Sequence, residues 1–384
     1  MSLSAEFLRF PPHWTVLPFT DAVKDATSGN AKLKKDEYLT TGSVPIVDQG
    51  QSLYGGYTDK KDSVCKSELP TIVFGDHTRA FKFIDEPFAL GADGAKVLEP
   101  RVKLDKRFLF HYLKQLRIES AGYSRHYKFL KESYVPVPPL SEQKRIAAIL
   151  DKADAIRRKR QQAIQLADDF LRSVFLDMFG DPVTNPKGFK KVPITELADV
   201  ITGFAFKSNE YVSDSSESVR LCRGANTLTG NFNWNDTAFW PKNKLKKLTG
   251  YLIKAGDIIL AMDRPWISSG LKVCVFPENQ RETYLVQRVA RLRPHRDSYT
   301  NYIYSCIQSK AFEKHCCPTE TTVPHISPIE LKSFEVLLPS AELIDKYHLI
   351  ISKVNCSLGE MVDGKCRSEE NFTALSHRAF TGQL

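Results

Sequence analysis

The sequence lacks any long hydrophobic run. No stretch approaches the roughly 18 consecutive apolar residues that a membrane-spanning helix needs, and the first residues, MSLSAEFLRFPPHW, lack the basic, apolar and small-residue order of a secretory signal. We therefore expect a soluble cytoplasmic protein with no membrane contact. Hydrophobic residues still make up 42% of the 384 positions, which excludes an intrinsically disordered chain and suggests two or three domains.

Paired cysteines are also missing. The eight cysteines include no CxxC pair, which argues against a zinc ribbon and a redox dithiol and favours reduced, mostly buried thiols. The cluster His315-Cys316-Cys317, with His325 nearby, has metal-binding side chains, but adjacent cysteines rarely both reach one ion. We predict no metal site.

Catalytic signatures are absent as well. The sequence has no GxxxxGK[ST] phosphate loop, GxGxxG turn, HExxH helix or GxSxG elbow, and no Asn/Asp-Pro-Pro-aromatic tetrapeptide of the kind that amino-methyltransferases use. Asp363-Gly364-Lys365 has the residue types of a nuclease site, but it lies inside a helical pattern and is better explained as a solvated helix face. We predict that the chain has no catalytic residues and is not an enzyme on its own.

The charge balance points to a polyanionic partner. Lys and Arg number 54 against 45 Asp and Glu, a net charge of +9, and the excess is spread over two long segments instead of one tail. Such a distribution is a mild electrostatic signal for nucleic acid.

Two segments have the periodicity of long helices. The first follows Pro138-Pro139, with Ser141 as N-cap, and meets no Gly or Pro before Gly180; the second follows Pro339, with Ser340 as cap. Apolar residues recur in 3,4 alternation in both. In the first they are Ile146, Ile149, Ala153, Ile156, Ala163, Ala167, Phe170 and Val174, and in the second Ile344, Tyr347, Ile351, Val354, Leu358, Met361, Phe372, Leu375 and Ala379.

Both patterns contain defects. Arg160 interrupts the first stripe, Lys365 and Ser368 fill the second less well, and Gly359 and Gly364 weaken that helix by roughly 1 kcal/mol each. A helix of about 38 residues still needs a partner. We predict that the two pack as an antiparallel coiled coil that acts as a spacer of defined length.

The chain also contains an internal repeat. Residues 17–21 (LPFTD) resemble residues 192–196 (VPITE), and residues 139–142 (PLSE) resemble residues 339–342 (PSAE). The fold class predicted is therefore α/β, in the mixed α+β sense, with two similar globules, two long antiparallel helices and a pseudo-twofold repeat. The predicted boundaries are 1–140 for the first globule, 141–180 for a central helix, 181–339 for the second globule and 340–384 for a C-terminal helix.

Residues 138–182, PPLSEQKRIAAILDKADAIRRKRQQAIQLADDFLRSVFLDMFGDP, resemble the central conserved region of the specificity subunit of type I restriction-modification systems. The resemblance extends over the chain through residues 200–208 (VITGFAFKS), residues 256–260 (GDIIL), and the segment from His325-Ile-Ser to Leu337-Leu-Pro339. It implies a non-catalytic DNA reader with two target recognition domains, each recognising one half of a split double-stranded DNA sequence.

The resemblance also implies partners. The paired helices would set the distance between the half-sites and bind modification subunits, two of which we expect. These subunits carry S-adenosylmethionine and methylate adenine N6, so this chain needs no cofactor of its own. A restriction subunit, a motor-endonuclease, joins in the complete enzyme. By resemblance only, we assign Glu142, Gln143, Lys144 and Arg145 to partner binding.

Side chains suited to DNA contact can be nominated in both globules. Arg and Lys favour guanine, Asn and Gln favour adenine, and other basic groups hold phosphates. The nominated residues of the first globule are Arg79, Tyr123, Arg125, His126 and Lys128, and those of the second are Lys207, Arg223, Asn226, Arg264, Gln287 and Arg288.

Two alternatives stay open at this point. The chain could be a coiled-coil scaffold whose globules bind proteins, in which case it would show no salt-sensitive DNA retention. It could also be a fused enzyme acting on DNA, which would require methylation or cleavage by the isolated chain. The run at residues 157–160 (RRKR) is equally open, as a phosphate or partner contact or as a solvated face.

Overall fold

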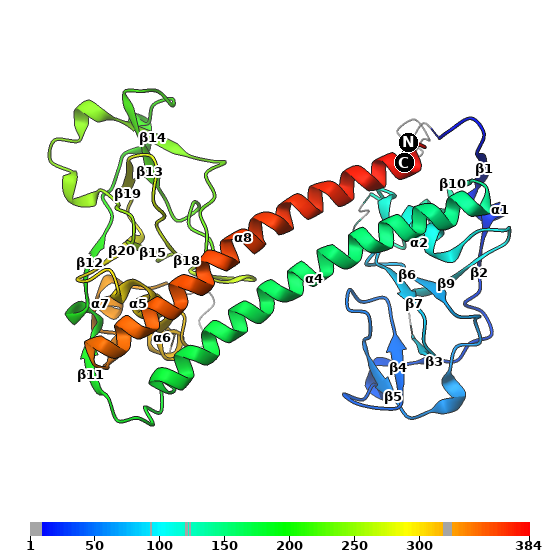
Figure 1. Cartoon of the computed structure of the whole chain (residues 1–384), viewed down its shortest axis with the longest axis horizontal. Helices are drawn as coiled ribbons and strands as arrows, with labels where there is room; N and C mark the ends of the chain where they lie inside the picture. The colour runs from blue at the N-terminus through cyan, green and yellow to red at the C-terminus, as the bar shows by residue number, and fades with distance from the viewer. Residues whose placement is uncertain (1–9, 93, 120–121, 123, 318–324) are drawn as a thin grey trace. The chain divides into compact units, whose positions relative to one another are not determined.

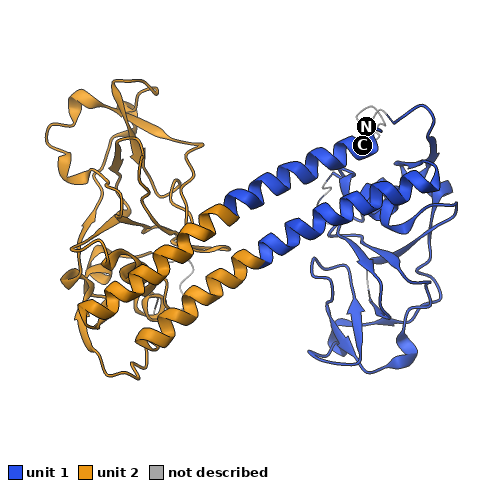
Figure 2. Ribbon diagram, in the orientation of Figure 1, with its two compact units in different colours: residues 1–162, 362–384 blue, residues 163–361 orange. Residues whose placement is uncertain are grey.

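The computed structural model describes residues 10–92, 94–119, 122, 124–317 and 325–384. The chain forms two compact units, which Figure 2 shows in different colours. Unit 1 contains residues 1–162 and 362–384, and unit 2 contains residues 163–361. In the described ranges no helix is long and apolar enough to cross a membrane.

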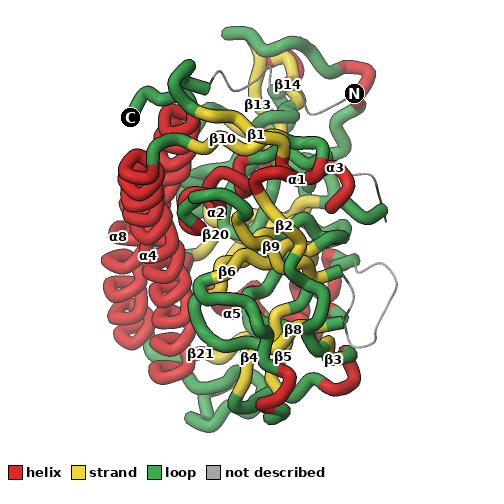
Figure 3. Tube along the Cα trace, turned by 90° about the vertical axis from the view of Figure 1, so that its right-hand side faces the viewer, coloured by secondary structure: helices red, strands yellow, loops and turns green. Residues whose placement is uncertain are grey.

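Unit 1 is built on two small sheets and a two-stranded ribbon (Figures 1 and 3). One sheet has the antiparallel order β2-β9-β6-β7, the other has the order β3-β8-β4-β5, and β1 pairs with β10. Its elements are β1 (Thr15–Pro18), α1 (Phe19–Ala22), β2 (Val23–Asp25), β3 (Lys32–Leu33), η2 (Lys35–Glu37), β4 (Val44–Val47), β5 (Gly56–Thr58), η3 (Lys61–Ser63), β6 (Thr71–Gly75), β7 (Phe81–Ile84), β8 (Ala89–Gly91), β9 (Ala95–Pro100), α2 (Lys106–Gln115), α3 (Tyr127–Lys131) and β10 (Tyr134–Val137).

Unit 2 repeats this plan with longer connections. Its sheets have the orders β12-β20-β15-β18 and β14-β13-β19, β11 pairs with β21, and a hairpin β16-β17 is added. Its elements are β11 (Lys190–Pro193), η4 (Ile194–Glu196), β12 (Ala198–Thr202), η5 (Ser208–Glu210), β13 (Ser218–Cys222), β14 (Ala238–Pro241), η6 (Lys242–Lys244), η7 (Thr249–Tyr251), β15 (Ile258–Ala261), β16 (Trp266–Ile267), β17 (Gly270–Leu271), β18 (Val273–Val275), β19 (Thr283–Leu285), β20 (Val289–Pro294), α5 (Tyr299–Ile307), α6 (Lys310–Cys316), α7 (Pro328–Ser333) and β21 (Glu335–Leu338).

The internal repeat is visible in how the strands pair. The chain enters each unit on a strand that pairs antiparallel with the last strand before a long helix, β1 with β10 and β11 with β21. A parallel pairing also recurs in the second sheet of each unit, between β4 and β8 in unit 1 and between β13 and β19 in unit 2. The predicted mixed α/β class with two similar globules and two long helices is therefore confirmed.

The two long helices are equal in length and are buried at equivalent positions. Helix α4 (Leu140–Phe179) and helix α8 (Ala341–Phe380) each have 40 residues. The fourth, seventh, eleventh and last residues are buried in both helices. They are Gln143, Ile146, Leu150 and Phe179 in α4, and Ile344, Tyr347, Ile351 and Phe380 in α8.

Aromatic clusters hold the helix ends in the cores of the units. In unit 1 the ring of Phe380 lies 5.5 Å from that of Phe108 and 5.4 Å from that of Tyr112. In unit 2 the ring of Phe179 lies 4.7 Å from that of Tyr302 and 5.1 Å from that of Tyr347. The core of unit 1 therefore includes the last residue of α8, which begins in unit 2. The core of unit 2 includes the last residue of α4, which begins in unit 1.

The predicted apolar stripe is wrong for the middle of α4. Ile156 and Phe170 are each 51% exposed, so burial is concentrated at the helix ends. The residues that interrupt the two apolar stripes instead contact one another inside unit 1. Arg160 donates to the carbonyl of Gly364 and to the hydroxyl of Ser368, and the guanidinium of Arg157 lies 5.0 Å from the ring centre of Phe372.

Candidate nucleic-acid interface

Three loops of unit 2 meet around the carboxylate of Asp263. One oxygen accepts a hydrogen bond from Nη1 of Arg288 at 2.7 Å, and the other lies 2.6 Å from Nδ1 of His325. Asp263 follows β15, Arg288 precedes β20, and His325 forms an isolated bridge with Asp263. Arg264 and Gln287 are exposed beside this cluster. The structure thus brings together three nominated residues, Arg264, Gln287 and Arg288.

The Asp263 carboxyl group is held in its charged form. Desolvation raises its pKa, but the hydrogen bonds from Arg288 and His325 and their positive charges outweigh that effect and lower the pKa below its usual value. The carboxylate therefore stays ionised at neutral pH and fixes one end of the Arg288 guanidinium. The remaining N–H groups of that guanidinium can donate to another acceptor.

The backbone at the nominated arginines is unusual. Within the described residues, five non-glycine residues have positive φ, and three of them are Arg79 (φ 60), Arg264 (φ 44) and Arg288 (φ 63). The other two are asparagines, which tolerate this region, whereas a long side chain occupies it at a cost. Strain of this kind clusters at functional sites, where the surrounding structure holds the residue in one orientation.

Unit 1 presents the equivalent loops. The amide of Asp76 donates to the carbonyl of Gly94 at 2.7 Å, and the amide of His126 donates to the carbonyl of Asp76 at 2.9 Å. In unit 2 the amide of Met262 donates to the carbonyl of Arg288 at 2.9 Å, and that of Ile326 donates to the carbonyl of Met262 at 2.9 Å. The same three loops therefore meet in both units.

The nominated residues of unit 1 take different places in this arrangement. Arg79, Arg125 and Lys128 are exposed, and Nη1 of Arg79 donates to the carbonyl of Ile118 at 2.8 Å. His126 is only 1% exposed and its ring lies against the carbonyl of Asp76, so we assign it to loop support. Tyr123 lies outside the described residues.

Two nominated residues of unit 2 hold their own loop. Asn226 is 1% exposed, and its amide group donates to the carbonyls of Asn233 and Asp236 at 3.0 and 2.9 Å and accepts from the amide of Arg223. The Arg223 guanidinium pairs with Asp236 at 3.0 Å. Because the hydrogen-bonding groups of Asn226 are used internally, we assign it to loop support and not to base reading.

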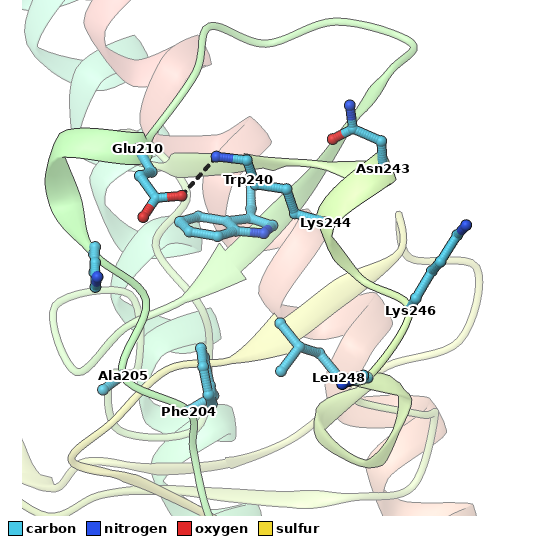
Figure 4. Close-up of a pocket in the computed structure, with 10 residues that line it drawn as sticks. Phe204, Ala205, Glu210, Trp240, Asn243, Lys244, Lys246 and Leu248 are labelled. Carbon is cyan, nitrogen blue, oxygen red and sulfur yellow. Dashed lines mark hydrogen bonds and ion pairs between the residues drawn. The ribbon is translucent and has the colours of Figure 1, made fainter.

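Lys207 lies in a third place, among the residues that line a hollow of about 440 Å³. Figure 4 shows this hollow with the ring of Trp240 in its lining. The hollow also has Lys244, Lys246 and Lys247 in its lining. Sequence reasoning missed these lysines and Trp240, although the run at residues 242–247 (KNKLKK) was a visible signal.

The residues assigned to partner binding divide into two pairs. Gln143 is 1% exposed, accepts from the amide of Asp105 at 2.6 Å and donates to the carbonyl of Pro138 at 2.7 Å. Glu142 accepts from Nε1 of Trp14 at 3.1 Å. Both therefore fasten α4 to the rest of unit 1. Lys144 and Arg145 are exposed, and Arg145 donates to the carbonyl of Leu384 at 2.9 Å.

The histidines and cysteines considered for a metal have other neighbours. Nε2 of His315 lies 2.9 Å from the carbonyl of Glu330, and His325 belongs to the Asp263 cluster. Among the residues that the structure describes, no three His, Cys, Asp or Glu side chains gather as a metal site.

This chain resembles known proteins in one domain, in its sequence over most of its length, and in its fold. Residues 14–166 match the model of the type I restriction modification DNA specificity domain. The MjaVIII specificity subunit of Methanocaldococcus jannaschii is 24% identical over 363 residues, which are 87% of this chain and 84% of that protein. The EcoAI specificity subunit of Escherichia coli is 29% identical over 180 residues, 45% of this chain and 30% of that protein.

The fold is shared with a solved structure. The S subunit of a type I restriction-modification system from M. genitalium matches with a TM-score of 0.63 and 15% identity over 99% of this chain and 98% of that chain. The fold and the two loop clusters define a class of protein with two similar heads, each with arginines exposed on its loops. Residues 14–166 thus resemble a type I restriction modification DNA specificity domain, and the chain is similar over most of its length to a type I restriction enzyme specificity subunit.

Proposed function

We propose that each unit of this specificity subunit reads one half of a bipartite DNA target. One observation carries the proposal. In each unit one four-stranded sheet has the same strand order, and the loop that follows its corresponding strand exposes an arginine with positive φ, Arg79 after β6 and Arg264 after β15. Arginine is the commonest reader of guanine in the major groove, and a rigid backbone reduces the entropy lost on binding.

The domain boundaries proposed are those of the repeat. Residues 1–140 and 181–339 would form the two reading domains, and residues 141–180 and 340–384 the two spacer helices. Two reading heads tied to a stiff spacer bind together only when their half-sites have one separation and one helical phase. The base pairs between the half-sites then need no contact.

The helices also offer a surface for partners. Leu166 and Leu349 are 62% and 61% exposed, and Ile156 and Phe170 add further apolar surface. Exposed apolar rows on a helix support protein binding. We expect two modification subunits to dock on the helices, beside Lys144 and Arg145, and restriction subunits to join them.

Catalysis would then belong to the partners. S-adenosylmethionine and adenine-N6 methylation are assigned to the modification subunits, and cleavage to the restriction subunits, all in the cytoplasm where the DNA lies. The chain itself would supply sequence specificity and a grip on both sides of the base that is flipped, whose unstacking costs a few kcal/mol.

The test is replacement of one reading domain. Residues 181–339 are exchanged for the matching segment of a related subunit, and methylated adenines are mapped across the genome of cells that carry either version. One half of the methylated sequence should change and the other half should stay the same. If both halves change, or neither does, the proposal fails.

A second test addresses the spacer. Insertion of one heptad beside Arg160 in α4 and one beside Gly364 in α8 lengthens each helix by about 10 Å at 1.5 Å per residue. That length corresponds to about three base pairs. The gap between the half-sites should widen by about that amount while both outer sequences persist; an unchanged gap would contradict the role of the helices.

A further inference from the structure

Unit 2 contains a hollow that the reading of bases does not use. It lies between the segment that follows β12 and the segment of η6 and its C-terminal neighbours, and its volume is about 440 Å³. Figure 4 shows Phe204 and Leu248 across the hollow from the ring of Trp240. This volume is within the range of small-ligand pockets, which is about 300–1,000 Å³.

The lining of the hollow is strongly basic. It includes four lysines, Lys207, Lys244, Lys246 and Lys247, against one acid, Glu210. Glu210 is already paired with Lys244, because Oε2 lies 2.6 Å from Nζ, and this hydrogen bond lowers the pKa of Glu210. Lys207, Lys246 and Lys247 are exposed and form no ion pair or side-chain hydrogen bond within the described ranges. Three positive charges therefore remain available for an anion.

The wall of the hollow also has an unused donor. Trp240 is 5% exposed, and its buried Nε1 has no hydrogen-bond partner among the described residues. An unpaired buried N–H is costly and uncommon in folded proteins. Lys244 lies over the indole ring, with Nζ 5.7 Å from its centre. An acceptor with negative charge would satisfy both the indole N–H and the lysines.

The backbone and the ion pair around this hollow have counterparts in unit 1, but the basic lining of the hollow does not. In unit 1 the last residue of η2, Glu37, pairs with Lys60 at 2.7 Å, as the last residue of η5, Glu210, pairs with Lys244 in unit 2. The same isolated bridge is present in both units: Phe239 bridges to Val212 in unit 2, and Tyr57 bridges to Leu39 in unit 1. The residue after the bridge is Trp240 in unit 2 and Thr58 in unit 1. Thr58 therefore stands in unit 1 where unit 2 has Trp240. Unit 2 has added an aromatic wall and further lysines to a shared frame.

We propose that this hollow is a phosphate site that holds a backbone phosphate of bound DNA. The hollow adjoins the reading loops, because the amide of Gln287 donates to the carbonyl of Phe204 at 2.8 Å. A DNA strand that passes Gln287 and Arg288 would reach the lysines next. The apolar side chains of Phe204 and Leu248, which also line the hollow, would contact the sugar next to the phosphate. The inference deepens the proposed function, since it assigns an anchor beside the bases that are read.

The test uses the indole N–H resonances of the full chain, labelled with ¹⁵N. The resonance of Trp240 is assigned from the variant Trp240→Phe. Three probes are added separately: inorganic phosphate, dAMP and a duplex of arbitrary sequence. The duplex should shift the Trp240 resonance, and dAMP should shift it in the same direction at higher concentration. If no probe shifts it, the site is refuted; if dAMP shifts it and the duplex does not, the assignment to DNA backbone is refuted.

Affinity measurements supply the second readout. The double substitution Lys246→Ala, Lys247→Ala should weaken duplex binding on any sequence and lower the slope of log affinity against log salt by about 1 for each phosphate that is no longer neutralised. Lys242→Ala is the matched control. It removes a lysine from the same basic run, but Lys242 donates to the carbonyl of Ser216 and does not line the hollow. Equal effects of the double variant and the control would overturn the proposal.

These results are independent of the domain exchange. The probes carry no target sequence, so the hollow can fail while base reading by the two units succeeds, and the reverse. Trp240→Phe keeps the packing of an aromatic ring and removes the indole N–H. It should weaken duplex binding by roughly tenfold, since a hydrogen bond to a charged group contributes about that factor.

Discussion

Arg288 donates to the carboxylate of Asp263 at 2.7 Å while its own backbone is held at φ 63. The side chain is therefore restrained at both ends. His325 approaches the other carboxylate oxygen from a third segment of unit 2. An arginine held in this way has little orientational freedom, which under the proposed function favours discrimination between bases over simple attraction to phosphate.

The substitution Asp263→Asn should therefore relax specificity. The amide cannot accept from Arg288 and His325 with full negative charge, so the guanidinium gains freedom. We expect discrimination at one base pair of one half-site to fall by about tenfold, at the lower end of the energy of a bidentate contact. Mapping of methylated adenines in cells that carry the variant measures this directly.

Asp214→Asn is the matched control for that variant. It breaks another exposed ion pair of unit 2, between Asp214 and Arg281, away from the Asp263 cluster. Exposed pairs of this kind contribute roughly 0–1 kcal/mol, so neither variant should unfold the unit. A similar loss of discrimination in both variants would show that Asp263 does not orient Arg288.

Gln143 should matter for stability and not for partner binding. The substitution Gln143→Ala removes the acceptor of the Asp105 amide and the donor to the Pro138 carbonyl, and leaves these groups without their partner. An unsatisfied buried group costs about 1–3 kcal/mol, so the melting temperature of the chain should fall by several degrees. Thermal unfolding of the purified chain measures the change.

Lys144→Ala provides the comparison on the next residue of α4. Its side chain is exposed, and a change there should alter stability by less than about 0.5 kcal/mol. If the helices dock modification subunits, Lys144→Ala or Arg145→Ala should instead weaken their association. A stable Gln143→Ala variant with lost partner binding would contradict the role that the structure gives to the glutamine.

Low pH should destabilise the packing of α2 against α4. His111 is 3% exposed, and its Nε2 lies 2.8 Å from Oδ1 of Asp151. Burial lowers the pKa of His111 and outweighs the raising effect of Asp151. The unfolded chain therefore takes up a proton at higher pH than the folded chain, so stability is lost as pH falls below about 6.5, the unfolded value for histidine.

The measurement is amide hydrogen exchange of the α2 peptide at pH 7 and at pH 5.5, corrected for the intrinsic rates. Protection should decrease at the lower pH in the native chain. The variant His111→Gln keeps a polar side chain but cannot titrate, so its protection should change less between the two conditions. An equal decrease in both proteins would rule out His111 as the group responsible.

The two glycines of α8 should respond differently to alanine. A Cβ at Gly359 would meet nothing within 4 Å, so Gly359→Ala should stabilise the helix by about 1 kcal/mol. At Gly364 the added atom would lie 3.0 Å from Nη1 of Arg160 and disturb its hydrogen bond to the Gly364 carbonyl. The gain there should be smaller. Paired melting curves would decide, and identical gains would mean that Arg160 does not pack on this glycine.

The sequence predicts the helices and the repeat well because their signals are local. A proline precedes both starts, and glycine follows the end of α4. Ser340 caps α8 as predicted, whereas the prediction of Ser141 as N-cap is wrong, because α4 begins at Leu140 and Ser141 lies in its first turn. The middle of the apolar stripe could not be interpreted in the same way. Arg160, Gly364 and Ser368 look like three defects along the chain, and only their meeting across two helices shows that they form one contact.

The interface is predicted less completely, and for a physical reason. Asn226 and Gln287 have the same kind of amide, but one is buried in a loop and the other is exposed beside Arg288. Residue type gives the chemistry of a side chain and not the direction in which its loop sends it. Asp263 escaped nomination because an acid is not an expected ligand for DNA, although it orients an arginine that is.

The division of unit 1 has a consequence for the order of events during synthesis. Unit 2 is one continuous segment, so it can complete its core as soon as residue 361 has left the ribosome. Unit 1 must wait for residues 362–384, because Phe380 closes the cluster with Phe108 and Tyr112. The half of the protein that is translated first is thus the half that matures last, and a nascent chain would expose its unfinished aromatic cluster to chaperones throughout that interval.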